Sequence, residues 1–279
     1  MAKRSNPVMS YIPGKSVIHA LTGTTKLVFF LLFTFSSMLT YDTRVLLGLL
    51  VISFSCFAVS HIKFKDVSFV FWFMVVFLAL NNFFIFLFSP DQGTELYGTR
   101  VVLCHLFGSY DLTREQLFYH FNISLKYFVA LPIALLFITA TNPSEFASSL
   151  NAVGVSYRIG YSVALALRYI PDIQRDYRNI STAQQARGVE LGKKVKLHKR
   201  VKNSISVLMP LIMSSLSRIE AISNAMELRG FGKEKKRTWY VQRKFSSSDY
   251  IAIAFGVVIL TASLIITFHD GNRFWNPFV

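Results

Sequence analysis

The chain has 279 residues, of which 52% are hydrophobic and 27 are phenylalanine. Long apolar runs account for this composition, which excludes an ordinary soluble domain. The formal net charge of +15 fits nucleic acid, anionic lipid or an acidic protein as a partner, and the apolar runs favour lipid and membrane-bound partners. Cys56 and Cys104 are far apart in sequence and imply neither a disulfide framework nor a CxxC metal site.

Five apolar runs predict membrane-spanning helices, at residues 27–41, 45–60, 67–88, 123–140 and 250–268. The first two are shorter than the roughly 20 residues that cross a bilayer. The first reaches that length if it begins at Leu21 and Lys26 extends its ammonium group to the membrane surface. Residues 89–122 have the composition of a polar loop. The sequence therefore predicts an all-α integral membrane protein with about five transmembrane helices.

Basic residues are unevenly distributed and orient these helices. Residues 142–249 hold 19 Lys and Arg against 8 Asp and Glu, and the N-terminal lead-in and the 61–65 turn are also basic. The 42–44 turn and the 89–122 loop are poor in bases. By the positive-inside rule we expect a plasma-membrane protein with its N-terminus in the cytoplasm and its C-terminus outside.

Two segments of the 142–249 region have the spacing of amphipathic helices. Residues 156–187 predict two helical segments around Pro171. The uncharged stretch between Arg158 and Arg168 is too short to cross a membrane, so residues 159–171 are expected to form a buried or interfacial helix. Residues 207–229 repeat the apolar spacing, with Pro210 in the first turn. Residues 193–202, with six bases in ten positions, lie between them.

The same short pattern closes both amphipathic segments. It appears as Ala183-Gln184-Gln185-Ala186-Arg187-Gly188 and as Ala225-Met226-Glu227-Leu228-Arg229-Gly230, with the arginines 42 residues apart. Gly just past a helix and a cation in its last turn are ordinary capping features. An Arg at a helix tip also presents a fixed fork of donors to a carboxylate, and a small Ala one turn earlier lets the helix enter a groove. The pattern alone leaves capping and docking equally open.

At these residues the chain resembles the transmembrane coupling subunit, or T component, of energy-coupling factor vitamin transporters, a branch of the ABC transporters. Residues 167–171 with 183–188 look like the first conserved block of that family, and residues 210–230 look like the second. Pro13, Gly14, Ser16, His19, Leu21 and Lys26 look like its N-terminal motif. The similarity covers nearly the whole chain, with one departure at Leu228, where the family usually has Ala.

The resemblance implies a non-catalytic subunit, without cofactor or metal, that joins two cytoplasmic ATPase subunits to a membrane-embedded vitamin-binding (S) subunit. It divides the chain into a membrane domain of four helices (1–141), a cytoplasmic coupling-helix region (142–249) and a last membrane helix with its tail (250–279). The ATPase-docking residues it implies are Ala183, Ala186, Arg187, Gly188, Ala225, Leu228, Arg229 and Gly230. The residues it implies for contact with the S subunit are Ile173, Tyr177, Ile180, Leu211, Ile212, Ile219 and Ile222.

Other motifs have simpler interpretations. Gly14-Lys15-Ser16 is a fragment of a phosphate-binding loop, but Met9 stands where that loop needs Gly. None of the six histidines, at 19, 61, 105, 120, 198 and 269, has a partner at metal-ligand spacing, and we expect interfacial or solvated side chains. Asn81-Asn82 predicts hydrogen bonds between helices, and Lys126 is expected to reach the membrane surface.

The 193–202 run lacks interleaved aromatic residues, so lipid headgroups or an acidic protein suit it better than nucleic acid. The alternatives to a coupling subunit are a membrane-embedded enzyme and a structural scaffold with an amphipathic cytoplasmic region. Against the enzyme, the sequence offers no plausible nucleophile–base set, carboxylate pair or metal constellation on the cytoplasmic side.

Overall fold

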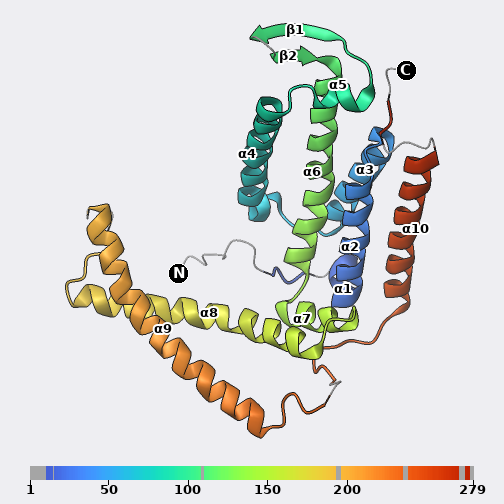
Figure 1. The fold of residues 1–279 in the computed structure, drawn as a ribbon. Coiled ribbons are helices and arrows are strands. Elements are labelled where there is room, and N and C mark those ends of the chain that lie inside the picture. The colour runs from blue at the N-terminus through green and yellow to red at the C-terminus, as the bar shows by residue number, and fades with distance from the viewer. Residues whose placement is uncertain are drawn as a thin grey trace. The chain divides into compact units, whose positions relative to one another are not determined.

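The structure is a computed structural model that describes residues 11–14, 16–107, 110–192, 196–234, 238–269 and 274–276. The lead-in with Met9, Lys15 of the phosphate-loop fragment, and residues 193–195 of the basic run lie outside the described residues. The chain forms two compact units (Figure 1). The first comprises residues 1–142 and 243–279, and the second comprises residues 143–242.

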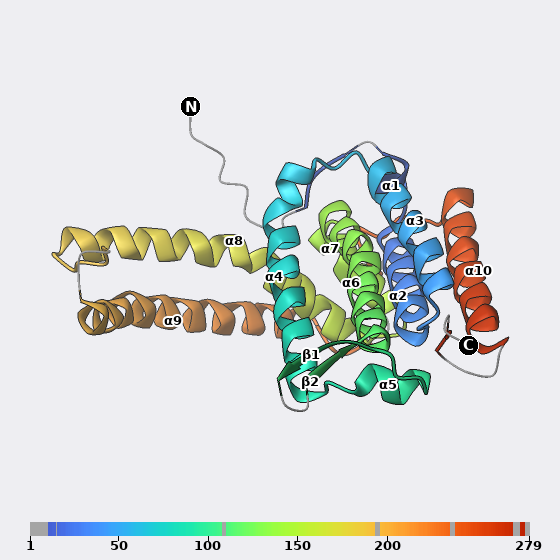
Figure 2. The same cartoon turned by 90° about the horizontal axis from the view of Figure 1, so that it is seen from above.

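The first unit is a helical bundle with a small β-hairpin (Figures 1 and 2). Its elements are α1 (Val17–Ala20), α2 (Gly23–Leu39), α3 (Thr43–Val59), α4 (Phe64–Phe88), α5 (Gln92–Tyr97), β1 (Val102–Phe107), β2 (Tyr110–Thr113), α6 (Arg114–Ala140) and α10 (Ser247–His269). Helix α6 packs against α2, α3 and α4, and α10 packs against α2. Their apolar core is formed by Phe33, Leu49, Val129, Ile133 and Ile259.

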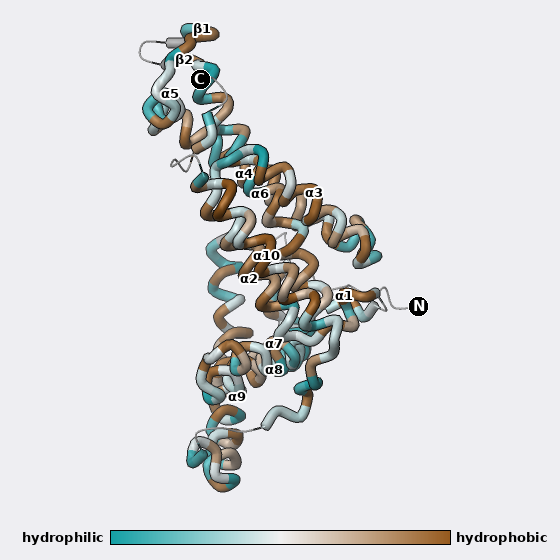
Figure 3. Tube along the Cα trace, turned by 90° about the vertical axis from the view of Figure 1, so that its right-hand side faces the viewer, coloured by the Kyte–Doolittle hydropathy of each residue, from teal (hydrophilic) through white to brown (hydrophobic). Residues whose placement is uncertain are grey.

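The hydropathy of these helices supports an all-α membrane protein. Among the described residues, α4, α6, α10 and the α9 helix of the second unit are long and apolar enough to cross a membrane. Helices α2 and α3 are apolar but have only 17 residues each. Figure 3 shows long hydrophobic stretches along α2, α3 and α10. The five predicted runs therefore coincide with five helices of the first unit, although two of them are short.

The prediction of a polar loop at residues 89–122 is wrong. This stretch contains α5, the antiparallel β1–β2 hairpin and the first turns of α6, which begins at Arg114 rather than at residue 123. Thr113 starts α6 early because its hydroxyl oxygen accepts the backbone N–H of Gln116. The polar side chains that suggested a loop are used as caps and cross-links.

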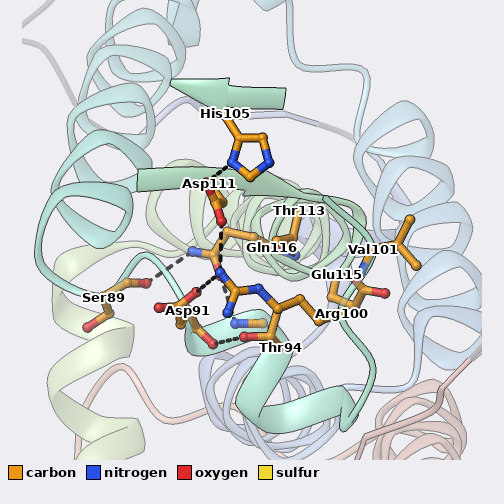
Figure 4. Close-up of polar contacts among 11 residues, drawn as sticks. Ser89, Asp91, Thr94, Arg100, Val101, His105, Asp111, Thr113, Glu115 and Gln116 are labelled. Atoms are coloured by element: carbon orange, nitrogen blue, oxygen red, sulfur yellow. Dashed lines mark hydrogen bonds and ion pairs between the residues drawn. The ribbon is translucent and has the colours of Figure 1, made fainter. Parts of the chain in front are cut away.

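Asp111 joins the hairpin to the segment before it (Figure 4). Its carboxylate accepts hydrogen bonds from Arg100 Nη2 at 2.8 Å and from His105 Nδ1 at 2.6 Å. The hydrogen bond from His105, with help from Arg100, holds the pKa of this carboxyl below its usual value. Charged hydrogen bonds therefore join the two strands of the hairpin to each other and to the segment before it.

Lys26 and Lys126 are buried, so the prediction that Lys126 reaches the membrane surface is wrong, and the condition under which the first apolar run would extend to Leu21 is not met. Lys26 is 5% exposed, and its Nζ donates to the carbonyl oxygen of Ala140 at 2.8 Å. Lys126 is 7% exposed, and its Nζ donates to the carbonyl oxygen of Met38 at 3.1 Å. Each ammonium group meets a carbonyl in the last turn of a helix, where carbonyls lack intrahelical partners.

His19 is also buried, contrary to the expectation of an interfacial or solvated side chain. Its Nδ1 lies 2.7 Å from Ser16 Oγ, and its Nε2 lies 3.1 Å from the carbonyl oxygen of Ile12. Asn82 confirms the prediction of an interhelical hydrogen bond, because its Nδ2 donates to Ser124 Oγ of α6 at 3.1 Å. His120, also on α6, lies 2.8 Å from Asn82 Oδ1.

The second unit contains α7 (Pro143–Ala152), α8 (Tyr157–Ala186) and α9 (Leu197–Leu228). Two predictions are wrong here, because Pro171 does not divide α8 and α9 begins ten residues before position 207. Pro210 consequently lies in the middle of α9 instead of in its first turn. A proline leaves the carbonyl four residues earlier without a donor. In α9 this is the carbonyl of Ser206, which accepts a hydrogen bond from Gln184 Nε2 of α8 at 3.2 Å.

We expect Gly256→Leu to destabilise the first unit, because Gly256 is where α10 approaches α2. A Cβ atom at this position would lie 3.1 Å from Leu32 Cδ1 and 3.2 Å from Phe29 Cδ2. Overpacking of this kind costs about 1–3 kcal/mol. The melting temperature of the detergent-solubilised protein measures the effect. Gly48→Leu is the matched control, since nothing lies within 4 Å of its Cβ position, and equal losses in both variants would contradict this packing.

The environment of His19 predicts a pH dependence. Burial lowers the pKa of the imidazole below its usual value, and the positive charge of Lys26 lowers it further. Because the folded state binds this proton less tightly, His19 stabilises the fold above pH about 6.5 and loses that contribution as the pH falls through its lowered pKa. Amide exchange of residues 16–22, corrected for intrinsic rates, should be faster at pH 5.5 than at pH 7.5. His19→Gln should remove this difference.

Candidate functional site

The two Arg-Gly ends have the same backbone conformation. Arg187 is the C-cap of α8, with φ −85° and ψ 8°, and Arg229 is the C-cap of α9, with φ −84° and ψ 11°. The glycines that follow them adopt positive φ values, 84° at Gly188 and 68° at Gly230. Only glycine adopts this conformation without strain, which explains the residue type at both positions.

Both ends close with the hydrogen bonds of a Schellman motif. After α8, the N–H of Gly188 donates to the Gln185 carbonyl at 3.0 Å and the N–H of Val189 donates to the Gln184 carbonyl at 3.0 Å. After α9, the same two bonds run from Gly230 to Glu227 and from Phe231 to Met226, each at 2.9 Å. The repeated sequence pattern is therefore a repeated structure, and each arginine leaves its helix at the same point of the turn.

The residues predicted to dock are open to solvent in both tips. Ala183, Ala186, Arg187 and Gly188 are exposed, and so are Ala225, Leu228 and Arg229, while Gly230 is half-buried. Leu228 is 90% exposed. Capping explains the glycines and their hydrogen bonds, but it does not require small and apolar side chains to face outward beside the arginines. We call these two surfaces, residues 183–188 and 225–230, the first and second tips.

The two tips lie at opposite ends of a helix pair. Helices α8 and α9 run antiparallel, since Gln184 bonds to Ser206 near the first tip and Arg218 bonds to Asp176 further along. The Arg218 Nη2–Asp176 Oδ2 distance is 2.6 Å, and both side chains are partly exposed. Helix α9 has 32 residues, a length of about 48 Å at 1.5 Å per residue. The pair thus holds two equivalent arginine tips far apart.

An apolar groove lies between α8 and α9 within the second unit, with a volume of about 800 Å³. Three of the predicted contact residues, Ile173, Ile219 and Ile222, line it. Tyr177 and Ile212 are exposed and Ile180 is half-buried, whereas Leu211 is only 9% exposed and is covered by the chain itself. Most of the predicted stripe is therefore open to a partner.

The exposed apolar surface extends beyond the predicted contact residues, and it reaches residues before position 207 because α9 begins earlier than expected. The additional large exposed side chains on α9 are Val201, Ile205, Leu208, Met209, Met213 and Leu216. Apart from the adjacent Leu208 and Met209, they follow one another in steps of three and four along the helix. The early part of this signal was missed because the bases of the 193–202 run interrupt the apolar spacing.

The second tip has an attachment that sequence reasoning did not find. Phe231 packs against the rings of Tyr157 and Tyr161, with centroid distances of 5.7 and 4.9 Å. Arg158 Nη2 donates to the carbonyl oxygen of Gly232 at 2.6 Å. These contacts fix the end of α9 to the beginning of α8, so the second tip is braced directly after its glycine.

Comparison with known proteins agrees with this architecture. Residues 14–240 match the family model of the cobalt transport protein, CbiQ. The chain belongs to this family. The transmembrane protein EcfT of the energy-coupling factor transporter of Exiguobacterium sibiricum is 25% identical over 267 residues, covering 92% of this chain and 95% of that protein. EcfT of Streptococcus equi is 26% identical over 264 residues, covering 89% and 92%.

EcfT of Limosilactobacillus fermentum is 31% identical over a shorter stretch of 146 residues, 49% of this chain and 54% of that protein. These relatives confirm the resemblance to the T component of energy-coupling factor transporters. Together with the apolar helices, they identify a multi-pass, all-α membrane protein.

The Asp176–Arg218 pair should help to hold α8 against α9. We expect Asp176→Arg and Arg218→Asp each to lower the melting temperature of the solubilised protein, because each places like charges across the helix pair. Partial exposure limits the pair to about 0.2–1 kcal/mol. The double exchange should recover most of the loss and should recover less at high salt. Additive losses in the double variant would show that the two side chains do not interact.

Proposed function

We propose that this chain is the coupling subunit of an energy-coupling factor importer. It transmits the ATP-driven movement of two ATPase subunits to a membrane-embedded S subunit, which binds the vitamin. The chain itself supplies no ATP hydrolysis, and it lies in the plasma membrane with its N-terminus inside and its C-terminus outside. Its coupling helices are α8 and α9 of the second unit.

The observation that supports this proposal most strongly is the pair of equivalent tips. Two exposed arginines in the same conformation, at opposite ends of an antiparallel pair, suit two equivalent partners better than one. Each guanidinium offers a fixed fork of donors to a carboxylate, and the small residues around it allow a close approach. A dimeric motor that presents the same groove twice fits this arrangement.

The apolar groove and stripe of the coupling helices support the second half of the proposal. Contiguous exposed apolar surface of this size marks an interaction site. Its length along α9 and its mostly apolar lining, in which Arg218 and Glu227 are the charged members among the described residues, suit an apolar partner embedded in the bilayer, the S subunit, with lipid as its neighbour. Nucleic acid does not fit such a surface, since its binding is dominated by phosphate contacts.

Leu228 distinguishes the two docking sites. It is 90% exposed, whereas Ala186 stands at the corresponding place in the first tip. The ATPase groove that takes the second tip must accommodate a side chain with three more heavy atoms. We therefore propose that the two tips contact their ATPases with different fit, the first following the usual Ala-Arg-Gly pattern of the family.

We expect Arg187→Glu to weaken ATPase association and to abolish uptake, because it reverses the charge at a docking tip. Arg229→Glu should do the same at the second tip, and the double variant should be worse than either if the sites are separate. The measurement is co-purification of ATPases with the tagged chain, identified by mass spectrometry of the intact complex, together with ATP hydrolysis by that complex.

Arg178→Glu is the matched control, since this arginine is exposed on α8 and donates to the carbonyl of Gln174 in its own helix. It should retain normal ATPase association. Normal association and uptake in both tip variants would refute the docking role. A wild-type chain that co-purifies with no ATPase would instead favour the scaffold, and turnover by the chain alone would favour the enzyme.

A further inference from the structure

The two units are joined by two connections of the chain, and both leave the first unit beside the same group of residues. The first connection follows the end of α6 at Ala140 and enters the second unit at Pro143. The second leaves the second unit at Gln242 and reaches α10 at Ser247. Any movement passed along the covalent chain between the units must pass through these two connections.

Lys26 holds the first connection. Its ammonium group donates to the carbonyl oxygen of Ala140 at 2.8 Å, and Ile12 donates its N–H to the carbonyl oxygen of Thr139 at 2.9 Å. Ala140 is the last residue of α6, so the end of this helix is bound by a charged donor from α2. A charged hydrogen bond to a helix C-terminus is favoured both by the free carbonyls and by the helix dipole.

Asp249 holds the second connection. Its carboxylate is buried, with the residue 2% exposed. Oδ1 accepts the N–H of Thr22 at 2.8 Å, and Oδ2 accepts the N–H of Ser246 at 2.8 Å. Because Ser246 immediately precedes α10, one carboxylate joins the start of that helix to the N-cap of α2. Arg243 Nη1 lies 3.5 Å from the carbonyl oxygen of Ala20 in the same segment.

The two attachments form one structure. Lys26 also donates to the carbonyl oxygen of His19 at 3.3 Å, and Thr22 accepts the N–H of Thr25 to cap α2. We call residues 12–26 with Asp249 the N-terminal clamp, apart from Lys15, which lies outside the described residues. It contains a buried cation and a buried anion, each satisfied by backbone groups. Breaking such contacts leaves a buried charge without its partner, which makes the clamp resistant to deformation.

We propose that the N-terminal clamp is the fixed anchor through which movement of the coupling helices reaches the membrane helices, with Lys26 and Asp249 as positioning residues. This inference rests on the proposed function, which supplies the movement. The clamp shares no residue with either tip, and the role proposed for it is not docking. Its role is to prevent both connections from yielding, so that displacement of the second unit moves α6, α10 and α2 together.

Lys126 provides a matched control within the same bundle. It is a second buried lysine, and it also donates to a carbonyl in the last turn of a helix, that of Met38. Met38 lies 12 residues beyond Lys26 along α2, a distance of about 18 Å, and neither connection adjoins it. Lys26→Met and Lys126→Met thus remove the same chemistry, but only the first removes it from the clamp.

The experiment measures how firmly the units are joined in the full complex. The native cysteines are replaced by serine, and spin labels are placed at exposed positions of each unit, Val51→Cys on α3 and Asn179→Cys on α8. Without Lys26→Met we expect one narrow distance distribution that shifts when ATP and vanadate are added. With Lys26→Met the width of the distance distribution should increase at least twofold, and ATP with vanadate should no longer move the entire distribution to a new mean distance. ATP hydrolysis should stay within about threefold of wild type.

Lys126→Met should keep the wild-type width and shift, although it lowers the melting temperature. Lys26→Arg should recover most of the lost shift because it retains a cationic donor. Asp249→Asn tests the second connection independently, and it should also broaden the distribution even if Lys26→Met fails to fold. Wild-type widths in the clamp variants, or equal broadening in Lys126→Met, would overturn the inference. A complex that contains no ATPase would refute the proposed function instead. The widths of the distance distributions measured without nucleotide would still test the clamp in that case.

Discussion

Carbonyl groups at helix ends are the constraint on which much of this structure depends. A helix leaves its last four carbonyls without intrahelical partners, and in an apolar environment they cannot be left unsatisfied. The chain answers this in two ways. Where α2 and α6 end inside the bundle, buried lysines from neighbouring helices supply the donors. Where α8 and α9 end in the open, a glycine turns the backbone so that the chain satisfies its own carbonyls.

These two solutions distinguish the helix ends that hold the bundle together from the helix ends that are exposed at the surface. The lysine-bound ends of α2 and α6 tie helices to one another and cannot contact a partner. The glycine-bound ends of α8 and α9 satisfy their last carbonyls within their own turns, and the small residues beside the arginines are exposed. Membership of the CbiQ family and the EcfT relatives give this division its context, a transmembrane subunit of a transporter.

Features set by local sequence were predictable. The apolar runs located the membrane helices, the Ala-Arg-Gly pattern located the two tips, and Asn82 was correctly expected to bond across helices. The errors arose where a distant segment decides the outcome. Nothing near Lys26 in sequence reveals that the carbonyl oxygen of Ala140 will accept a hydrogen bond from its ammonium group, because these residues are 114 positions apart. Lysines in apolar runs were therefore assigned to the membrane surface.

The same cause explains the errors at prolines and in the 89–122 stretch. In sequence, Pro210 resembles the proline that often begins a helix. Its place in the middle of α9 becomes understandable once the Ser206 carbonyl, which Pro210 leaves without a donor, is seen to have a partner on α8. The polar side chains of residues 89–122 resemble a loop until the hairpin brings Asp111 between Arg100 and His105. Each is a contact between segments, which residue spacing alone does not encode. The brace at Phe231 was missed for this reason as well.

Pro210 has a mechanical consequence for the coupling helices. Its nitrogen has no hydrogen, so it cannot give the Ser206 oxygen the hydrogen bond that the residue four places further on normally supplies in a helix. A partner that changes their crossing angle therefore meets one interhelical bond, from Gln184, that has no competitor within its own helix. The proline therefore gives α8 and α9 a fixed point of contact close to the first tip.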